Sequence, residues 1–295
     1  VYSNLQIRQD GIGMRIYEGL LYFFIYGILG WCAEVAFAAV KERRFVNRGF
    51  LNGPICPIYG VGVVMVVVFL EPFEDQWLLL YLASAVLVTL IEGMTGYVLD
   101  KLFHHKWWDY SELPLNIGGY VCLLFSVVWG VACVVIVKAV HPLVGDLCAL
   151  IPLGAGILIL SVLSAALAAD LTVTVGGILR WNRQLDAMEK IAADLRELSG
   201  KMGENIYENV MDTMELREKV DAAVEEKRQQ LAEQRQLLAE TKEQAAELRR
   251  KYKELAERSL RTGRHMLRAF PKLQSRRHKE ILEQIRERIR TEGRH

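Results

Sequence analysis

Five long runs of apolar residues constrain this chain more than any other feature of its sequence. They lie at about 16–40, 53–70, 77–99, 118–140 and 148–179. About 20 apolar residues in a helix are enough to cross the hydrocarbon core of a bilayer, and a helix satisfies its own backbone hydrogen bonds there. The pattern therefore predicts an all-α, polytopic membrane protein with about five transmembrane helices.

Charged residues are distributed very unevenly along the chain. Residues 1–180 contain 10 Lys+Arg and 13 Asp+Glu, whereas residues 181–295 contain 26 and 22. An apolar part is therefore followed by a tail dense in both signs of charge. We expect an N-terminal extension at 1–15, a transmembrane domain at 16–181, a cytoplasmic long helix or coiled coil at 182–262, and a basic amphipathic helix at 263–295.

The loops between the apolar runs suggest an orientation. Loop 41–48 contains four Lys and Arg residues, whereas the next connector, 71–75, contains three acidic residues and no basic one. Lys and Arg in short loops favour the cytoplasmic side of a membrane. The sequence therefore predicts a bacterial cytoplasmic membrane protein with its N-terminus outside and its C-terminus inside.

Two stretches of the apolar part repeat the same order of parts. In residues 30–60 an apolar helix carries Glu34, and a basic connector then leads to Asn52. In residues 88–120 an apolar helix carries Glu92, and a connector rich in Lys, His and Trp leads to Asn116. In the predicted orientation the two stretches form two helical hairpins that run in parallel through the membrane. They would be related by an axis near the membrane normal. The alternative is a chance likeness between two amphiphilic hairpins.

Three acidic residues lie inside apolar runs, at similar depths from the predicted cytoplasmic side: Glu34, Glu92 and Asp170. An acidic side chain that faces lipid costs a few kcal/mol, so such residues usually face a bundle interior or a water-filled cavity. We therefore expect a polar cavity, open to the cytoplasm, that takes a cation, a proton or an amine-bearing substrate. Its candidate lining residues are Glu34, Glu92, Asp170, Asn52, Asn116 and Tyr59.

A purely structural role for the same acids is the competing interpretation. In that case the carboxyl groups would hydrogen-bond polar neighbours on adjacent helices, or would pair with Lys41 and Arg43 reaching inward. They would then fix the packing of the helices without binding a ligand.

Signs of enzymatic or cofactor chemistry do not appear in the sequence. There is no GxxxxGK[ST], GxGxxG, GxSxG or HExxH motif. The five cysteines form no CxxC pair, and we interpret them as packing residues. His104, His105 and Asp109 have unsuitable spacing for a metal site. We therefore expect no enzyme, no cofactor and no metal.

The tail carries an uninterrupted heptad pattern from Val220 to Leu255. Such a pattern is typical of a coiled coil and suggests a homodimer, although polar residues in the seam also allow an intramolecular hairpin or a single charged helix. The basic end of the chain could bind anionic lipid headgroups or an acidic protein. Nucleic acid is an unlikely partner because acidic residues are interleaved and no recognition fold is visible.

Several segments resemble one family of small bacterial membrane proteins. The segments are FFIYGILGWCAEV, RGFLNGPICPIYGVG, LIEGMTGYVLDKLF and WWDYSELPLNIGGYVCL. They resemble the type IV ABC-transporter permease family over roughly Tyr17–Val140. The resemblance implies a multi-span membrane protein with a transport role and a separate ATPase subunit as a candidate partner. It assigns no role to single residues, and it does not extend to the tail.

We therefore expect an integral membrane transport component of permease type, embedded in a lipid bilayer. The alternative is a membrane scaffold that transports nothing and whose tail assembles chains or recruits a cytoplasmic partner.

Overall fold

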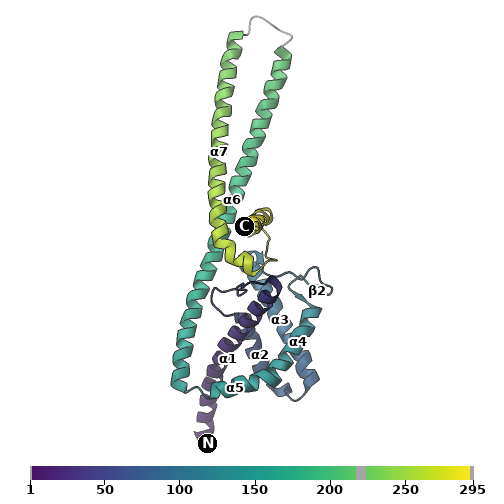
Figure 1. Cartoon of the computed structure of the whole chain (residues 1–295), viewed down its shortest axis with the longest axis vertical. Helices are drawn as coiled ribbons and strands as arrows, with labels where there is room; N and C mark the ends of the chain where they lie inside the picture. The colour runs from purple at the N-terminus through teal and green to yellow at the C-terminus, as the bar shows by residue number, and fades with distance from the viewer. Residues whose placement is uncertain (1, 217–223, 293–295) are drawn as a thin grey trace. The chain divides into compact units, whose positions relative to one another are not determined.

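The computed structural model describes residues 2–216 and 224–292, and these are almost entirely helical (Figure 1). The helices are α1 (Tyr2–Glu42), α2 (Pro57–Leu70), α3 (Trp77–Phe103), α4 (Leu123–Val135), α5 (His141–Ala149), α6 (Leu153–Leu216), α7 (Val224–Ala269) and α8 (Lys279–Glu292). A 3-10 turn (Glu71–Phe73), a π-helical turn (Ile136–Val140) and the short strands β1 (His105–Lys106), β2 (Asn116–Ile117), β3 (Val121–Cys122) and β4 (Gln274–Ser275) complete the described elements.

The chain divides into two compact units. The first comprises Val1–Leu179 with Arg264–Arg277, and the second comprises Arg180–Gly263 with His278–His295. Helix α6 passes from one unit into the other without a break, so the chain crosses from the predicted transmembrane domain to the predicted tail inside a continuous helix.

Four helical stretches in the described chain are long and apolar enough to cross a membrane: Gly13–Glu42, Trp77–Phe103, Leu123–Ala149 and Leu153–Glu208. The expected membrane protein is therefore confirmed. The second apolar run forms only the 14-residue helix α2, which is about 21 Å long at 1.5 Å per residue. The count of five crossings thus stays a prediction.

The start of α2 differs from the predicted start near Gly53. The helix begins at Pro57 because the preceding backbone is bound elsewhere: the Cys56 N–H donates a hydrogen bond to the Gly27 carbonyl, at 2.9 Å. Proline is well suited to the first position of a helix, where an N–H has no intrahelical acceptor. The structure therefore has an ordinary proline start for this helix.

The stretch between the fourth and fifth apolar runs, at 141–147, is helical. The π-helical turn joins α4 to α5, and the chain turns back only at 150–152. Val144 and Cys148, one turn apart on α5, are buried in the same apolar cluster as residues of α1 such as Leu21. This buried face explains why the helix continues past Val140.

Helices α1 and α2 pack closely, as do α3 and α4, and the relation of the two pairs by a repeat stays a prediction. Around them, large apolar side chains are exposed on every long helix, among them Phe37, Leu82, Val131 and Leu158. An apolar outer surface of this kind suits a lipid environment.

Gly60 allows the close approach of α2 to α1. A Cβ atom there would lie 2.3 Å from the Phe23 carbonyl oxygen. Because overpacking costs about 1–3 kcal/mol, we expect Gly60→Ala to lower the melting temperature of the detergent-solubilised protein by about 5 °C. Gly62→Ala is the matched control, since Gly62 is buried in the same helix but has no atom within 4 Å of such a Cβ. Equal shifts for the two variants would contradict this packing.

Residues 264–277 belong to the first unit despite their late place in the sequence. Strand β4 pairs antiparallel with β1, with Ser275 opposite His105. Trp107, only 3% exposed, follows β1. Its ring meets three phenylalanines edge to face, at centroid distances of 5.0–6.4 Å: Phe50, Phe103 and Phe270. The late segment is thus packed against both predicted cytoplasmic loops.

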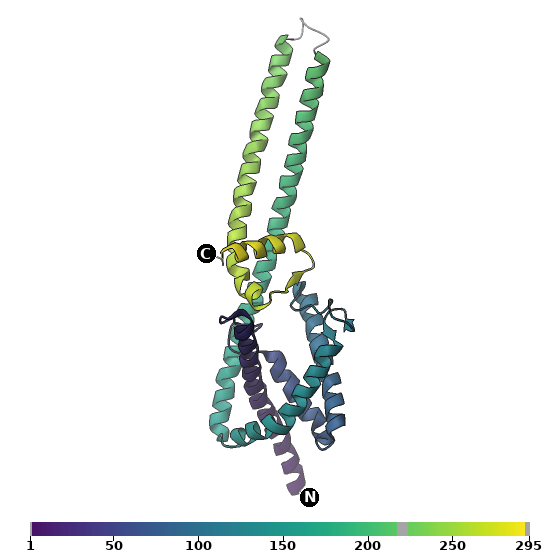
Figure 2. The ribbon, with the colours of Figure 1, turned by 45° about the vertical axis from the view of Figure 1, so that its right-hand side comes forward.

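In the second unit, α6 and α7 run side by side in opposite directions (Figures 1 and 2). The buried Trp181 indole donates a hydrogen bond to Ser259, at 2.8 Å. On α8, the apolar residues Ile281, Leu282 and Ile285 are buried. The apolar face of this basic helix is therefore covered within the unit, which leaves only its polar face for the predicted lipid or protein contact.

Part of the predicted heptad seam falls outside what is described: Val220 entirely, and the side chains at Val224, Lys227, Leu231 and Gln234. From Leu238 onward the seam residues are the partly buried ones on α7. Since α7 lies beside α6 of the same chain, the intramolecular hairpin accounts for this part of the pattern. The homodimer stays a prediction.

Candidate functional site

Glu34 lies on α1, two turns before the helix ends. The Tyr59 hydroxyl, from α2, donates a 2.6 Å hydrogen bond to Glu34 Oε1. Arg48, from the basic connector, forms an ion pair with Glu34 Oε2 at 3.2 Å. Tyr59 can reach this position because its ring packs on Gly30, where a Cβ would lie 2.4 Å from the ring. Both oxygens of Glu34 are thus bound, one of them by a cation.

Glu92 lies in the corresponding part of α3 and is only 8% exposed. The Tyr110 hydroxyl donates a 3.1 Å hydrogen bond to Glu92 Oε1. The Trp129 side chain, from α4, lies beside the same carboxyl group. Glu92 Oε2 is buried and has no hydrogen-bond partner among the described residues.

The two acidic groups belong to one cluster. The ring of Tyr59 meets that of Trp129 edge to face, with centroids 5.7 Å apart. Burial, the nearby Glu92 and, more weakly, Glu34 raise the pKa of Tyr110, so its hydroxyl keeps the proton that it donates. We call this group the Glu–Tyr cluster: Glu34, Arg48, Tyr59, Glu92, Tyr110 and Trp129.

Asp170 has a different environment. Its Oδ2 accepts a 2.7 Å hydrogen bond from the Gly53 N–H, and its Oδ1 accepts bonds from the backbone and side chain of Asn52 and from Thr174. The carboxyl group therefore ties the turn before α2 to α6. The structure brings the predicted residues Asn52 and Asp170 together: Asp170 holds backbone N–H groups, and the Asn52 side-chain amide donates to Asp170 and Thr174.

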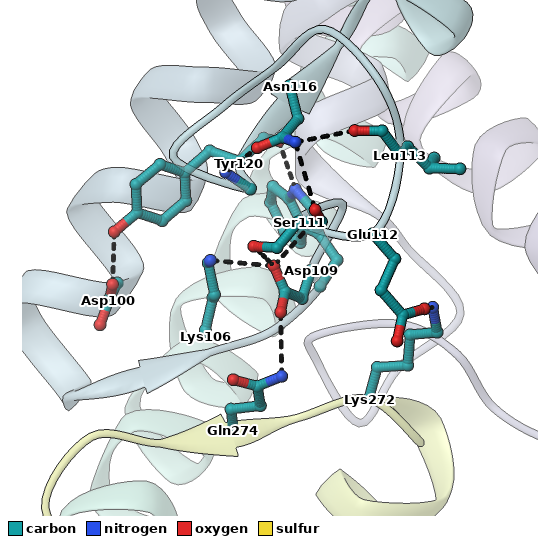
Figure 3. A network of polar contacts seen from close by, with 12 residues as sticks. Asp100, Lys106, Asp109, Ser111, Glu112, Leu113, Asn116, Tyr120, Lys272 and Gln274 are labelled. Carbon is teal, nitrogen blue, oxygen red and sulfur yellow. Dashed lines mark hydrogen bonds and ion pairs between the residues drawn. The ribbon is translucent and has the colours of Figure 1, made fainter.

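Asn116 lies in the connector between α3 and α4 and also holds backbone (Figure 3). Its amide donates to the carbonyls of Ser111 and Leu113 and accepts from the Gly119 N–H. It contacts none of the other predicted site residues through these bonds. Its role there is to shape the connector that carries Tyr110.

Asp109 is the centre of the polar network in the same connector (Figure 3). It accepts hydrogen bonds from Lys106, Ser111 and Gln274. Burial acts to raise the pKa of Asp109, but the hydrogen bonds from Ser111 and Lys106 outweigh burial and lower the pKa below its usual value. The carboxylate stays ionised at neutral pH and joins the connector to β4.

Asp100 lies at the inner end of α3 and is 2% exposed. Arg276, beside β4, forms an ion pair with its Oδ2 at 2.6 Å, and the Tyr120 hydroxyl donates a short hydrogen bond to the same oxygen. Arg276 also donates to the Tyr120 oxygen, at 2.9 Å. This group fixes residues 264–277 to the first unit.

Comparison with known families agrees with the membrane architecture. A family model described as "Putative ABC-transporter type IV" matches residues 21–175, which is more than half of the chain. The chain belongs to this family. The type IV ABC-transporter match includes the whole Glu–Tyr cluster and Asp170, and it excludes the tail. Neither curated proteins nor solved structures gave a significant match.

Three residues of the cluster were not predicted: Arg48, Tyr110 and Trp129. Arg48 lies in the basic connector, where Lys41 and Arg43 had been considered as partners for the acids. The positions of Tyr110 and Trp129 in the sequence follow no helical spacing from Glu92. The folding of the connector and of α4 against α3 brings these two side chains to the Glu92 carboxyl group.

Proposed function

We propose that this type IV ABC-transporter family member is a membrane transport component of permease type, and that the Glu–Tyr cluster is its transport site for a cation or a proton. The observation that carries the proposal is that Glu34 and Glu92, from two helical pairs, belong to one cluster. Each accepts a hydrogen bond from its own tyrosine hydroxyl, and the Tyr59 and Trp129 rings are in contact. Ionisable residues inside a membrane are costly to keep and are commonly part of a substrate or ion path.

The proposed transport site contains fewer of the predicted residues than the cavity expected from the sequence. Asp170 and Asn116 are excluded from it because their polar atoms hold backbone groups, and Asn52 is excluded because its side-chain amide is bound to Asp170 and Thr174. Energy would come from an ion gradient or from a separate ATPase, since the chain carries no phosphate-binding loop motif. No enzymatic step is part of the proposal.

Ion flux in membrane vesicles tests this function. Vesicles from cells that express the full chain retain any native ATPase partner. A pH-sensitive dye enclosed in the vesicles reports proton entry under an imposed membrane potential. The assay is run with and without ATP, and also with methylammonium as a model amine substrate. We expect flux above vesicles without the protein, and a decrease of tenfold or more in Glu34→Gln and Glu92→Gln. A tenfold decrease corresponds to about 1.4 kcal/mol in the barrier.

Asp170→Asn is the matched control, because it neutralises a third intramembrane acid that the proposal excludes. Its flux per folded protein should stay near that of the unaltered chain. Normal flux in both Glu variants, or an equal loss in all three, would contradict the proposed site.

A membrane scaffold is the second candidate function. It is favoured by residues 264–277, which belong to the first unit and pair through β4 with β1, and which are continuous in the chain with the helices before and after them. A scaffold without transport predicts no flux above background in any of these vesicles.

A further inference from the structure

The three intramembrane acids differ in how their oxygens are satisfied. Glu34 has a tyrosine donor and a cation, Arg48. Asp170 has a backbone donor on Oδ2 and both backbone and side-chain donors on Oδ1. Glu92, more than nine-tenths buried, accepts a hydrogen bond from Tyr110 on Oε1 and has the Trp129 side chain beside its carboxyl group. Its Oε2 has no hydrogen-bond partner, and no ion pair is found for it among the described residues.

The groups around Glu92 do not neutralise a negative charge. Tyr110, from the connector, and the uncharged Trp129, from α4, lie at the Glu92 carboxyl group. Cys122, Tyr59 and Glu34 lie near Tyr110. The one cation of the Glu–Tyr cluster, Arg48, is bound to Glu34. An isolated carboxylate buried in such surroundings is strongly unfavourable, and the neutral acid avoids this cost.

A proton suits the site better than a metal ion. The neighbours of the Glu92 carboxyl group supply O–H and N–H hydrogens, whereas a hard metal cation requires six or more oxygen ligands. A protonated carboxyl group gains an O–H donor while the other oxygen still accepts from Tyr110. Protonation therefore removes the buried negative charge without any further ligand.

We propose that Glu92 is a proton-binding site: it holds a proton at neutral pH in the resting protein, and it exchanges that proton with the Glu34–Tyr59 side of the cluster during transport. Binding converts the carboxylate and one proton into the neutral acid, with no other bond made or broken. The second half of this statement rests on the proposed transport function, whereas the first half does not.

Infrared difference spectroscopy of the full chain in lipid vesicles tests the first half directly. A protonated carboxylic acid has a carbonyl stretching band that a carboxylate lacks, and the band shifts in heavy water. We expect this band at neutral pH in the unaltered protein and in Asp170→Asn, and its loss in Glu92→Gln. Absence of the band, or its persistence in Glu92→Gln, would overturn the proposal.

Tyr110→Phe provides a second variant that leaves the carboxyl group in place. Removal of the donor to Oε1 should shift the band to the frequency of a free carbonyl without abolishing it. An unshifted band would also contradict the assignment. If the Glu92 band is present but no vesicle shows flux, the proton site stands and the proposed transport function fails, so the two failures can be told apart.

Discussion

A Trp107→Ala variant is expected to lose about 3–5 kcal/mol of stability in the first unit, the range found for large-to-small changes of buried aromatic residues. Trp107 is nearly inaccessible and fills the space between Phe50, Phe103 and Phe270. Alanine would leave a cavity at the junction of both connectors and the late segment. The measurement is the melting temperature in detergent, which should fall by about 10 °C.

Trp107→Phe separates the effect of the cavity from that of the indole nitrogen. The Trp107 N–H is buried and has no hydrogen-bond partner among the described residues, so its removal costs no bond. Phenylalanine keeps an aromatic ring against the three neighbours, and we expect less than half of the alanine effect. Trp77→Ala, at an exposed site, should change the melting temperature little. Similar losses at Trp77 and Trp107 would show that the cluster does not hold the unit together.

Apolar length and the cost of buried charge made much of the first unit predictable. Runs of apolar residues located the membrane helices, because the bilayer sets their length. Glu34 and Tyr59 were placed in one site because an acid in an apolar helix requires a polar neighbour. The same reasoning gave Glu92 as a site residue, although its donor was not identified.

Contacts between residues far apart in sequence could not be predicted. β1 and β4 pair over only two residues each, about 170 positions apart, and so short a pairing leaves no periodic pattern. The binding of Asp170 to the Asn52–Gly53 backbone was also missed. Pro54 and Pro57 explain it in part, because a proline disfavours helix in the residue before it and so leaves the neighbouring N–H groups in need of acceptors.

An Arg276→Ala variant is expected to loosen residues 270–277 from the first unit. Asp100 would remain buried without its cation, and a stranded charge of this kind costs about 3–5 kcal/mol when both partners are buried. Arg276 is more than half exposed, so solvent screening reduces the cost to about 2 kcal/mol. Hydrogen exchange measured by mass spectrometry should be roughly 30-fold faster in peptides covering this segment and β1.

Arg277→Ala is the matched control, because it removes the same charge from the next residue, which is exposed. It should leave the exchange rates near those of the unaltered protein. Equal acceleration by the two variants would mean that net charge, and not the Asp100 ion pair, holds the segment.

The double variant Asp100→Asn with Arg276→Ala identifies the source of the cost. An amide at position 100 can still accept the hydrogen bond from Tyr120 but carries no charge. If the destabilisation by Arg276→Ala comes from the stranded carboxylate, adding Asp100→Asn should restore part of the protection, and the two effects will be far from additive. Additive effects would instead show that the loss of the guanidinium contacts accounts for the loosening. The backbone hydrogen bond from the Arg276 N–H to the His104 carbonyl does not involve the substituted side chains, so it is common to all variants.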